Sequence, residues 1–223
     1  MDGWNGERQI GKKIEEIEEK HVERYRFAQK YCTNKNVLDA ACGCGYGSNI
    51  LSQNARSILA VDISNDAIDY AKNHWNRQNI SFKTCDLNSD ISNLGKFDVI
   101  VSFETIEHLD ASINQTLEKF YGILNQGGVM IISHPEKEKN LNPVDVSESR
   151  KKILVKRILF QMKEMFTIDT KNPDGLKNFH KHFEIDGIDV RKKLEQMDIN
   201  ILVDCHQPGR FDTPYHIIVG EKR

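Results

Sequence analysis

The sequence predicts an α/β fold built on a doubly wound parallel sheet. Short apolar segments alternate with amphipathic segments along the first 134 residues, an order that is typical of β-α-β units. The apolar segments are almost continuously hydrophobic, as expected of strands that are covered on both faces. With 223 residues, the chain is long enough for one domain with a sizeable core.

Each element is predicted from its local pattern. Residues 10–31 carry apolar side chains at helical spacing and predict a first helix. Five strands are then predicted, at 36–40, 57–64, 80–87, 96–104 and 129–133. Helices are predicted between them, from Ser48 onward, over 64–79 with Ser64 as N-cap, and around 111–124. The glycines of "NQGG" (125–128) are expected to end the last of these helices.

The pattern changes after Pro135. Residues 136–183 are polar and charged, and they include a basic amphipathic segment at 149–166. We expect a mostly helical insertion there, over the edge of the sheet where ligands bind. Two further apolar segments, at 199–207 and 215–222, predict the last strands and bring the number to seven.

Composition limits the class of protein. The formal net charge of −2 gives no global electrostatic reason to expect nucleic acid or an anionic membrane as a partner. No apolar run is as long as a membrane helix, and the N-terminus lacks the apolar core that a signal peptide carries. Five cysteines without a CxxC pair favour reduced thiols over a disulfide framework or a zinc site. We expect a cytoplasmic protein, and the pattern does not predict its oligomeric state.

A glycine run follows the first predicted strand, in "VLDAACGCGYG" (37–47). Its spacing differs from the dinucleotide fingerprint, and no Gly-Lys-Ser/Thr follows, which excludes a P-loop. Alternate glycines at Gly43, Gly45 and Gly47 would let a ligand lie against the backbone of a strand-to-helix turn. A tight turn without any ligand is the alternative.

Acidic residues end the first three predicted strands, at Asp39, Asp62 and Asp86. A carboxylate at the end of the second strand can accept hydrogen bonds from both hydroxyls of a ribose. A carboxylate at the end of the third can accept from an adenine amino group. Each acid alone is compatible with a solvated loop, but all three beside a glycine turn indicate an adenosine-containing ligand.

These motifs together resemble one family. The segments "VLDAACGCGYGS", "VDIS", "CDL", "FDVIVSFETIEHL" and "LNQGGVMIIS" are similar to class I S-adenosylmethionine-dependent methyltransferases. The resemblance covers residues 20–134 and, more loosely, the last 25, and it implies a Rossmann-like sheet of seven strands. It also implies S-adenosylmethionine as cofactor, held by Tyr25, Asp39, Ala41, Gly43, Gly45, Asp62, Ile63, Asp86, Leu87 and Phe103.

The resemblance also implies individual roles. Asp39 and the backbone of Gly43 and Gly45 would hold the methionine end of the cofactor. Asp62 would hold the ribose, Asp86 and the Leu87 backbone would contact the adenine, and Phe103 and Glu104 would lie near the sulfonium. Ala41 departs from the family pattern, which has glycine there. Since alanine is the smallest change, we expect cofactor binding to survive it.

The N-terminal segments "GERQ" and "HVERYRFA" resemble the lid helix of one bacterial branch, which includes surface-glycan and other small-molecule enzymes. Tyr25 would then be a contact from the lid. The expected organisation is a helical lid at 1–35 and a methyltransferase domain at 36–223, which contains the substrate-capping insertion at 136–183.

Candidate catalytic residues lie in "FETIEHLD" (103–110), just past the fourth strand. Transfer to an oxygen usually needs a base or a metal. His108 is the candidate base, with Glu104 as the second candidate. The alternative is that Glu104, Glu107 and His108 form an ordinary loop-to-helix cap, with the carboxylates at the positive helix end.

A metal-assisted variant is a further alternative. Glu104, Glu107 and His108 share one face if their turn is helical, and His180 and His182 follow later. This is similar to the small-RNA 3′-terminal ribose 2′-O-methyltransferases, whose later motif would match here at residues 182–184. The small-molecule branch carries a Phe-His pair that would match His180 instead, and we assign no metal ligand.

The sequence therefore predicts an enzyme that transfers a methyl group from S-adenosylmethionine to a small-molecule acceptor. An oxygen of a sugar or glycan precursor is the preferred acceptor. Metal-assisted methylation of an RNA 3′-terminal ribose is one alternative, and a non-catalytic cofactor-binding subunit is another. The basic segment 149–157 would either bind phosphate or form the solvated face of an amphipathic helix.

Overall fold

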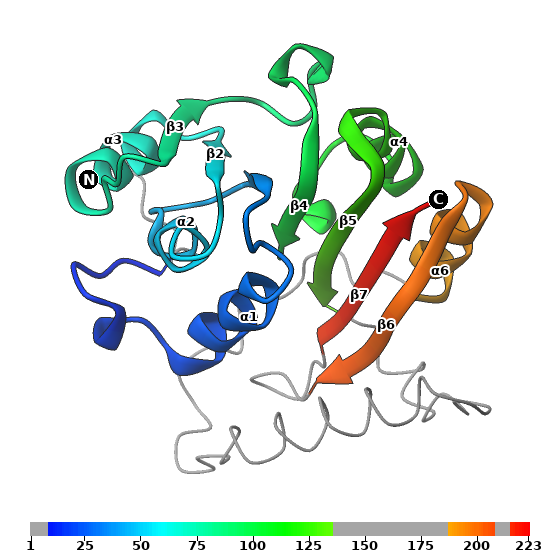
Figure 1. Cartoon of the computed structure of the whole chain (residues 1–223), viewed down its shortest axis with the longest axis horizontal. Coiled ribbons are helices and arrows are strands. Elements are labelled where there is room, and N and C mark those ends of the chain that lie inside the picture. Colours follow the sequence, from blue (N-terminus) through cyan, green and yellow to red (C-terminus); the bar gives the residue numbers. More distant parts are fainter. Residues whose placement is uncertain (1–8, 136–186, 208–214) are drawn as a thin grey trace.

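The structure, a computed structural model, describes residues 9–135, 187–207 and 215–223. They form a seven-stranded sheet with the strand order β3-β2-β1-β4-β5-β7-β6 (Figure 1). Strands β1 to β5 run parallel to one another, whereas β7 pairs antiparallel with both β5 and β6. The predicted doubly wound α/β fold with seven strands is confirmed.

The bounds of β1, β6 and β7 agree with the prediction, β2, β3 and β4 are shorter than predicted, and β5 is longer at both ends. The strands are β1 (Asn36–Ala40), β2 (Ser57–Asp62), β3 (Ile80–Thr84), β4 (Phe97–Phe103), β5 (Leu124–Pro135), β6 (Ile199–Gln207) and β7 (Tyr215–Lys222). The helices are α1 (Glu19–Gln29), α2 (Tyr46–Leu51), α3 (Asn65–His74), α4 (Ile113–Ile123) and α6 (Gly187–Gln196). Three short 3₁₀ helices are η1 (Ile14–Glu16), η2 (Ser92–Leu94) and η3 (Ile106–His108).

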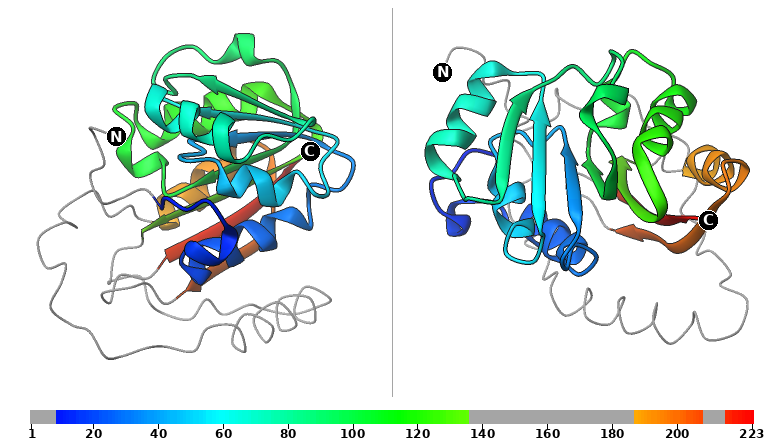
Figure 2. Two further views of the ribbon diagram at one scale, coloured as in Figure 1. Left: turned by 90° about the vertical axis from the view of Figure 1, so that its left-hand side faces the viewer. Right: turned by 45° about the horizontal axis from the view of Figure 1, so that its top comes forward.

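Helices cover both faces of the sheet (Figure 2), and two clusters of buried side chains join them to it. One cluster joins the sheet to α1, α2 and α3, through side chains such as Phe27, Leu51 and Ile68. The other joins it to α4 and α6, through side chains such as Phe120 and Leu194. Helix α1 therefore shares its core with one face of the sheet.

The first helix is shorter than predicted. It begins at Glu19, and η1 takes the place of its expected first turns. A Cβ built on Gly11 would lie 2.9 Å from the Cδ1 atom of Ile17, so the chain folds back at Gly11 and buries Ile17. A continuous helix would separate these residues by about 9 Å along its axis and would lose this contact.

The junction of α4 and β5 also differs from the prediction. Strand β5 begins at Leu124, directly after α4, so 125–128 lies inside the strand and is not a helix stop. Gly127 has a φ of +69°, and the pairing of β5 with β4 shifts register opposite this segment, between Phe97 and Val99. The glycine accommodates an irregularity in the ladder, which explains its presence within a strand.

Two helices differ from the prediction. Helix α2 begins at Tyr46 and not at Ser48, and α6 has no counterpart in the prediction. The N-cap at Ser64 is confirmed, because its hydroxyl accepts the backbone N–H of Ala67. The predicted insertion at 136–183, with its basic segment and with His180 and His182, lies outside the described residues.

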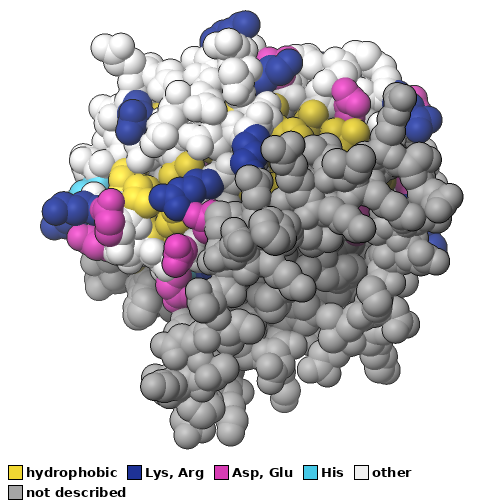
Figure 3. All heavy atoms as spheres, turned by 60° about the horizontal axis from the view of Figure 1, so that its bottom comes forward, with side chains coloured by type: hydrophobic (Ala, Val, Ile, Leu, Met, Phe, Trp, Pro, Cys, Tyr) yellow, Lys and Arg dark blue, Asp and Glu magenta, His cyan; other side chains and the backbone are white. Residues whose placement is uncertain are grey.

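On the face shown in Figure 3, basic and acidic side chains are interspersed over the described residues, with apolar side chains between them. This mixture agrees with a net charge near zero. None of the helices in the described ranges is long and apolar enough to span a membrane.

Candidate functional site

The site lies where the order of the strands reverses. Strands β1 and β4 are neighbours in the sheet, and the chain leaves β1 toward β2 on one side and β4 toward β5 on the other. In open α/β sheets, ligands bind outside the carboxyl ends of the strands at this point. The turn at 41–45 follows β1 at this edge of the sheet.

Glycines in this turn serve different purposes. Gly43 has a φ of +54°, and a Cβ built on it would meet no heavy atom within 4 Å, so the backbone faces open space. Gly45 has a φ of +88°, and a Cβ there would lie 2.6 Å from the Cβ of Ala71. Gly43 therefore offers exposed backbone to a ligand, whereas Gly45 permits the packing of α3 against the turn.

Ala41 adopts a left-handed conformation, with a φ of +64°. A side chain at such an angle costs roughly 1–2 kcal/mol relative to the right-handed region. The one departure from the family pattern thus falls at a position whose backbone favours glycine. The chain nevertheless makes the turn, because Cys42 donates its backbone N–H to the carbonyl of Val61 on the neighbouring strand, with an N···O distance of 2.8 Å.

Asp62 connects this turn to β2. Its Oδ2 accepts the backbone N–H of Gly43 and its Oδ1 accepts that of Ser64, each at an N···O distance of 2.9 Å. The side chain is almost fully buried. A carboxylate held by two backbone donors keeps further lone pairs for the hydroxyls of a ligand.

The end of β3 is the expected adenine side. Asp86 accepts the backbone N–H of Asn88 at 2.8 Å, and Leu87 is buried. Lys119 from α4 donates to the carbonyls of Leu87 and Asn88 and so fixes this loop. Ile63, next to Asp62, is 60% exposed and is one of two large hydrophobic side chains exposed in the described residues.

Asp39 lies beneath the turn. The side chain is completely buried, and its two oxygens accept the hydroxyls of Tyr25, at 3.2 Å, and Ser48, at 2.6 Å. Burial raises the pKa of Asp39 to about 7, although both hydrogen bonds lower it. The oxygens expected to face the methionine end of a cofactor thus bind α1 and α2 in this structure.

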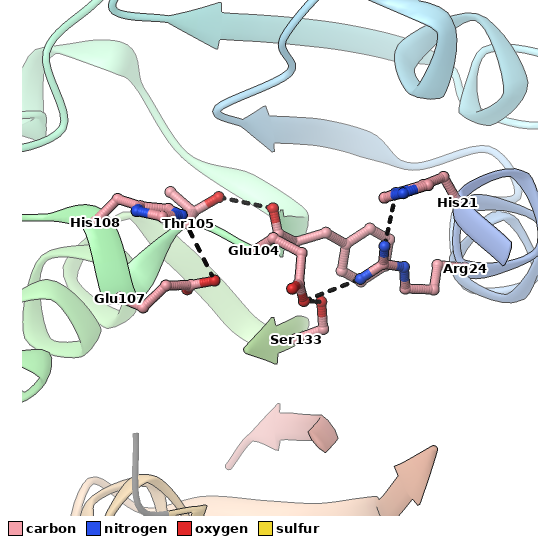
Figure 4. Close-up of polar contacts among 8 residues, drawn as sticks. His21, Arg24, Glu104, Thr105, Glu107, His108 and Ser133 are labelled. Atoms are coloured by element: carbon pink, nitrogen blue, oxygen red, sulfur yellow. Dashed lines mark hydrogen bonds and ion pairs between the residues drawn. The ribbon is translucent and has the colours of Figure 1, made fainter. Parts of the chain in front are cut away.

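Glu104 is held from two sides, as Figure 4 shows. Its Oε1 accepts the hydroxyl of Ser133 on β5 at 2.7 Å and pairs with the Arg24 guanidinium on α1 at 2.9 Å. Arg24 also donates to Nδ1 of His21 at 2.7 Å. Burial raises the pKa of Glu104, and Arg24 opposes that rise. Glu104, the candidate catalytic carboxylate, therefore also holds α1 in place through its ion pair with Arg24.

The backbone of Glu104 is unusual, because its φ is +51°. The 3₁₀ helix η3 covers only Ile106–His108. The expectation that Glu104, Glu107 and His108 share one helical face is therefore wrong for Glu104, since a residue with positive φ cannot continue a right-handed helix. In the described part of the chain, no group of three potential ligands is placed to hold a metal ion.

Glu107 is a buried acid. Its side chain is 1% exposed, and neither carboxylate oxygen has a hydrogen-bond partner among the other described residues. The Nε2 atom of the His108 ring lies 4.0 Å from its Oε1, and the side chain of His108 is 46% exposed. Burial, followed by the charge of Glu104, raises the pKa of Glu107 well above its ordinary value.

We predict that Glu107→Gln makes the protein more stable at neutral and higher pH. The folded protein binds the Glu107 proton more tightly than the unfolded chain does, so this group lowers stability as pH rises from about 5 toward its raised pKa. Glutamine cannot ionise, and the free energy of unfolding at about pH 8 should rise by at least about 1 kcal/mol. Urea unfolding at about pH 5 and pH 8 measures the difference.

The control for this prediction is Glu118→Gln on α4, where the carboxylate is mostly exposed and pairs with Lys193. No stabilisation that grows with pH is expected there. Equal stability of Glu107→Gln and the wild type at pH 8 would contradict the assignment of Glu107 as a costly buried acid.

The sequence patterns did not predict several residues of the site. Arg24, His21 and Ser133 reach Glu104 from elements that are distant in sequence, and Ser48 reaches Asp39 from α2. All four residues lie in segments that carry the family resemblance, but no local pattern indicates their partners, since only the folded sheet brings them together.

Sequence comparison relates the chain to known proteins. A model of the family described as "Methyltransferase domain" matches residues 32–187. A probable S-adenosylmethionine-dependent methyltransferase of Mycolicibacterium smegmatis is 28% identical over 122 residues, which cover 53% of this chain and 45% of that protein. A ubiquinone biosynthesis O-methyltransferase of Coxiella burnetii is 29% identical over 114 residues, or 49% of this chain and 48% of that protein. The chain spans less than half the length of these relatives.

Structural comparison agrees on the fold. The N-methyltransferase NodS from Bradyrhizobium japonicum, in complex with S-adenosyl-L-homocysteine, matches with a TM-score of 0.63 at 14% identity, over 92% of this chain and 86% of that one. Magnesium protoporphyrin IX methyltransferase from Synechocystis, also with this product bound, matches with a TM-score of 0.60 at 18% identity, over 92% and 82% of the two chains.

Proposed function

Because the chain belongs to the methyltransferase-domain family, we propose that it is an enzyme that transfers a methyl group from S-adenosylmethionine to a small-molecule acceptor. The observation that carries this proposal is the turn at the switch point of the sheet. Gly43 exposes its backbone to open space there, and the Asp62 carboxylate accepts its N–H. Glycine backbone beside an acid at a strand end is what an adenosine ligand needs.

The residues fit this cofactor in a consistent way. Asp62 would accept the ribose hydroxyls, the exposed side chain of Ile63 would cover one face of the adenine, and Asp86 with the Leu87 backbone would contact its edge. Gly43 would leave room for the methionine end, Gly45 would shape the turn that presents it, and Asp39 would be the nearby negative charge. When bound, S-adenosylmethionine would supply a methyl group on a positively charged sulfur, so that a nucleophile can attack the methyl carbon while the sulfur leaves as the thioether of S-adenosylhomocysteine.

His108 and Glu104 are the candidate groups on the acceptor side. His108 has an exposed ring next to the end of β4, so it can reach the proton of a bound acceptor. Glu104 is fixed by Ser133 and Arg24, and we assign it the role of orienting the acceptor rather than removing its proton. Phe103, at the end of β4, would lie beside the reacting sulfur.

We assign a hydroxyl of a small molecule as the acceptor, with a sugar or glycan precursor as the first class to test. An exposed imidazole is the group expected for removing a proton from an alcohol or phenol. The similar Coxiella protein is named as an O-methyltransferase, which supports oxygen as the acceptor atom. The similar NodS is named as an N-methyltransferase, so amines belong in the same test.

The test is transfer of label from S-adenosyl-L-[methyl-³H]methionine to acceptors. We expect the protein to label a component of a polar small-molecule extract, and we expect the rate to be unchanged by EDTA. Panels of nucleoside-diphosphate sugars, phenols and amino sugars then identify the acceptor atom. Label that enters only RNA 3′ ends, at a rate abolished by EDTA, would overturn the proposal in favour of metal-assisted ribose methylation. Cofactor binding without label transfer to any fraction would favour a non-catalytic subunit.

A further inference from the structure

Helix α1 is connected to the glycine turn through one buried carboxylate. Asp39 is the second-last residue of β1, just before the turn, and Ser48 lies on α2, just after it. The Ser48 hydroxyl donates to the Asp39 carboxylate at 2.6 Å. Tyr25 on α1 donates to the other oxygen of the same carboxylate at 3.2 Å. A single group therefore holds both ends of the turn and the helix that covers it.

The ring of Tyr25 is fitted closely into this place. A Cβ built on Gly47 would lie 2.1 Å from the Tyr25 ring, so the ring packs directly on the backbone of α2. Phe103 and Tyr46 contact it edge to face, with centroid distances of 5.0 and 5.5 Å. With its ring held on three sides, Tyr25 presents its hydroxyl to Asp39 in one fixed direction.

We propose that Tyr25 is a positioning residue of the cofactor site, which acts through Asp39 to keep that carboxylate charged and to couple the packing of α1 to the shape of the turn. This inference rests on the proposed function. It replaces the direct lid-to-cofactor contact expected of Tyr25 with an indirect one, because the Tyr25 hydroxyl is used by Asp39.

The pKa of Asp39 lies near neutral pH, so the hydrogen bond from Tyr25 changes how much of Asp39 is charged there. Burial raises its pKa to about 7, and the hydrogen bonds from Ser48 and Tyr25 lower it. Without the Tyr25 hydroxyl, Asp39 would hold its proton to higher pH. An uncharged Asp39 would attract the ammonium group of the cofactor's methionine end less strongly.

The titration of Asp39 depends on the titratable groups around it. The titratable groups that act on Asp39, or on which it acts, are Tyr25, Cys32, Cys42, Tyr46 and Asp62. Burial raises the pKa of the two tyrosines and the two cysteines above their ordinary values, so all four stay neutral near pH 7. The negative charge of Asp62 raises the pKa of Asp39 further.

The experiment is calorimetric titration with S-adenosylhomocysteine between about pH 6 and pH 8.5. For the wild type, we expect affinity to rise with pH through a midpoint near 7. In Tyr25→Phe, this midpoint should move upward by about one pH unit, and Ser48→Ala should move it in the same direction. Tyr46→Phe is the matched control, because Tyr46 packs on the same ring and its hydroxyl makes no hydrogen bond with the described residues.

The outcomes separate this inference from the proposed function. If the wild type binds the product and Tyr25→Phe weakens binding equally at all pH values, Tyr25 only supports packing and the inference is wrong. A wild-type affinity that does not vary with pH also overturns it, while the proposed function stands. If the folded wild type does not bind the product at any pH, both fail. Thermal unfolding of each variant confirms that it is folded.

Discussion

Replacing Asp62 with alanine is expected to lower the affinity for S-adenosylhomocysteine by at least about 100-fold. The carboxylate does two things that alanine cannot do. It accepts the backbone N–H groups of Gly43 and Ser64, which fixes the turn against β2, and it is proposed to accept both ribose hydroxyls. Hydrogen bonds to a charged group are worth about 1.5–3 kcal/mol each, and about 2.7 kcal/mol corresponds to a 100-fold loss. Isothermal titration calorimetry measures the change.

Asp90→Ala is the matched control for this prediction. Asp90 accepts the backbone N–H of Ser92 two residues later at 2.9 Å, as Asp62 does with Ser64. It is not among the residues assigned to the cofactor, and its replacement should leave the affinity unchanged. Asp62→Asn adds a conservative variant that keeps the size of the side chain. Binding by a folded Asp62→Ala protein with wild-type affinity would show that the ribose lies elsewhere.

Replacing His108 with asparagine is expected to slow methyl transfer by about 100-fold or more while leaving product affinity unchanged. A positioned base contributes typically 10²–10⁴-fold to such a reaction, and His108 has an exposed ring at the end of β4. The measurement is the initial rate of label transfer from S-adenosyl-L-[methyl-³H]methionine to the polar extract, beside calorimetry with S-adenosylhomocysteine.

His74→Asn serves as the control for His108, because His74 is an exposed histidine on α3, away from the end of β4. It should retain the wild-type rate. A wild-type rate in His108→Asn would mean that solvent or another group, and not His108, removes the proton of the acceptor. In that case the arrangement of Glu104, Glu107 and His108 would be the ordinary cap that the sequence also allowed.

Local patterns predicted the sheet well for a physical reason. Strands β1, β6 and β7 have the predicted bounds, because buried strands leave runs of apolar residues with sharp polar ends. The N-cap Ser64 is equally local, since its hydroxyl bonds three residues ahead. Glycines were less informative, because Gly127 lies in a strand irregularity rather than at a helix end.

The contacts that define the site are mostly not local. Arg24 and Glu104 are 80 positions apart in the sequence and meet only because α1 packs over the ends of β4 and β5. Burial of Glu107 was not predictable either, since an acid at the start of a short helix normally indicates a solvated cap. The positions of the acids along the chain indicated a cofactor, but their hydrogen-bond partners required the fold.

We place the cofactor at the switch point of the sheet, with its ribose on Asp62 and its methionine end beside Gly43. A crystal structure of the protein with S-adenosylhomocysteine is the sharpest test of this placement. We expect both ribose hydroxyls within hydrogen-bond distance of the Asp62 carboxylate, with the homocysteine part beside the backbone of Gly43. Product bound at another edge of the sheet, or a ribose turned away from Asp62, would contradict it.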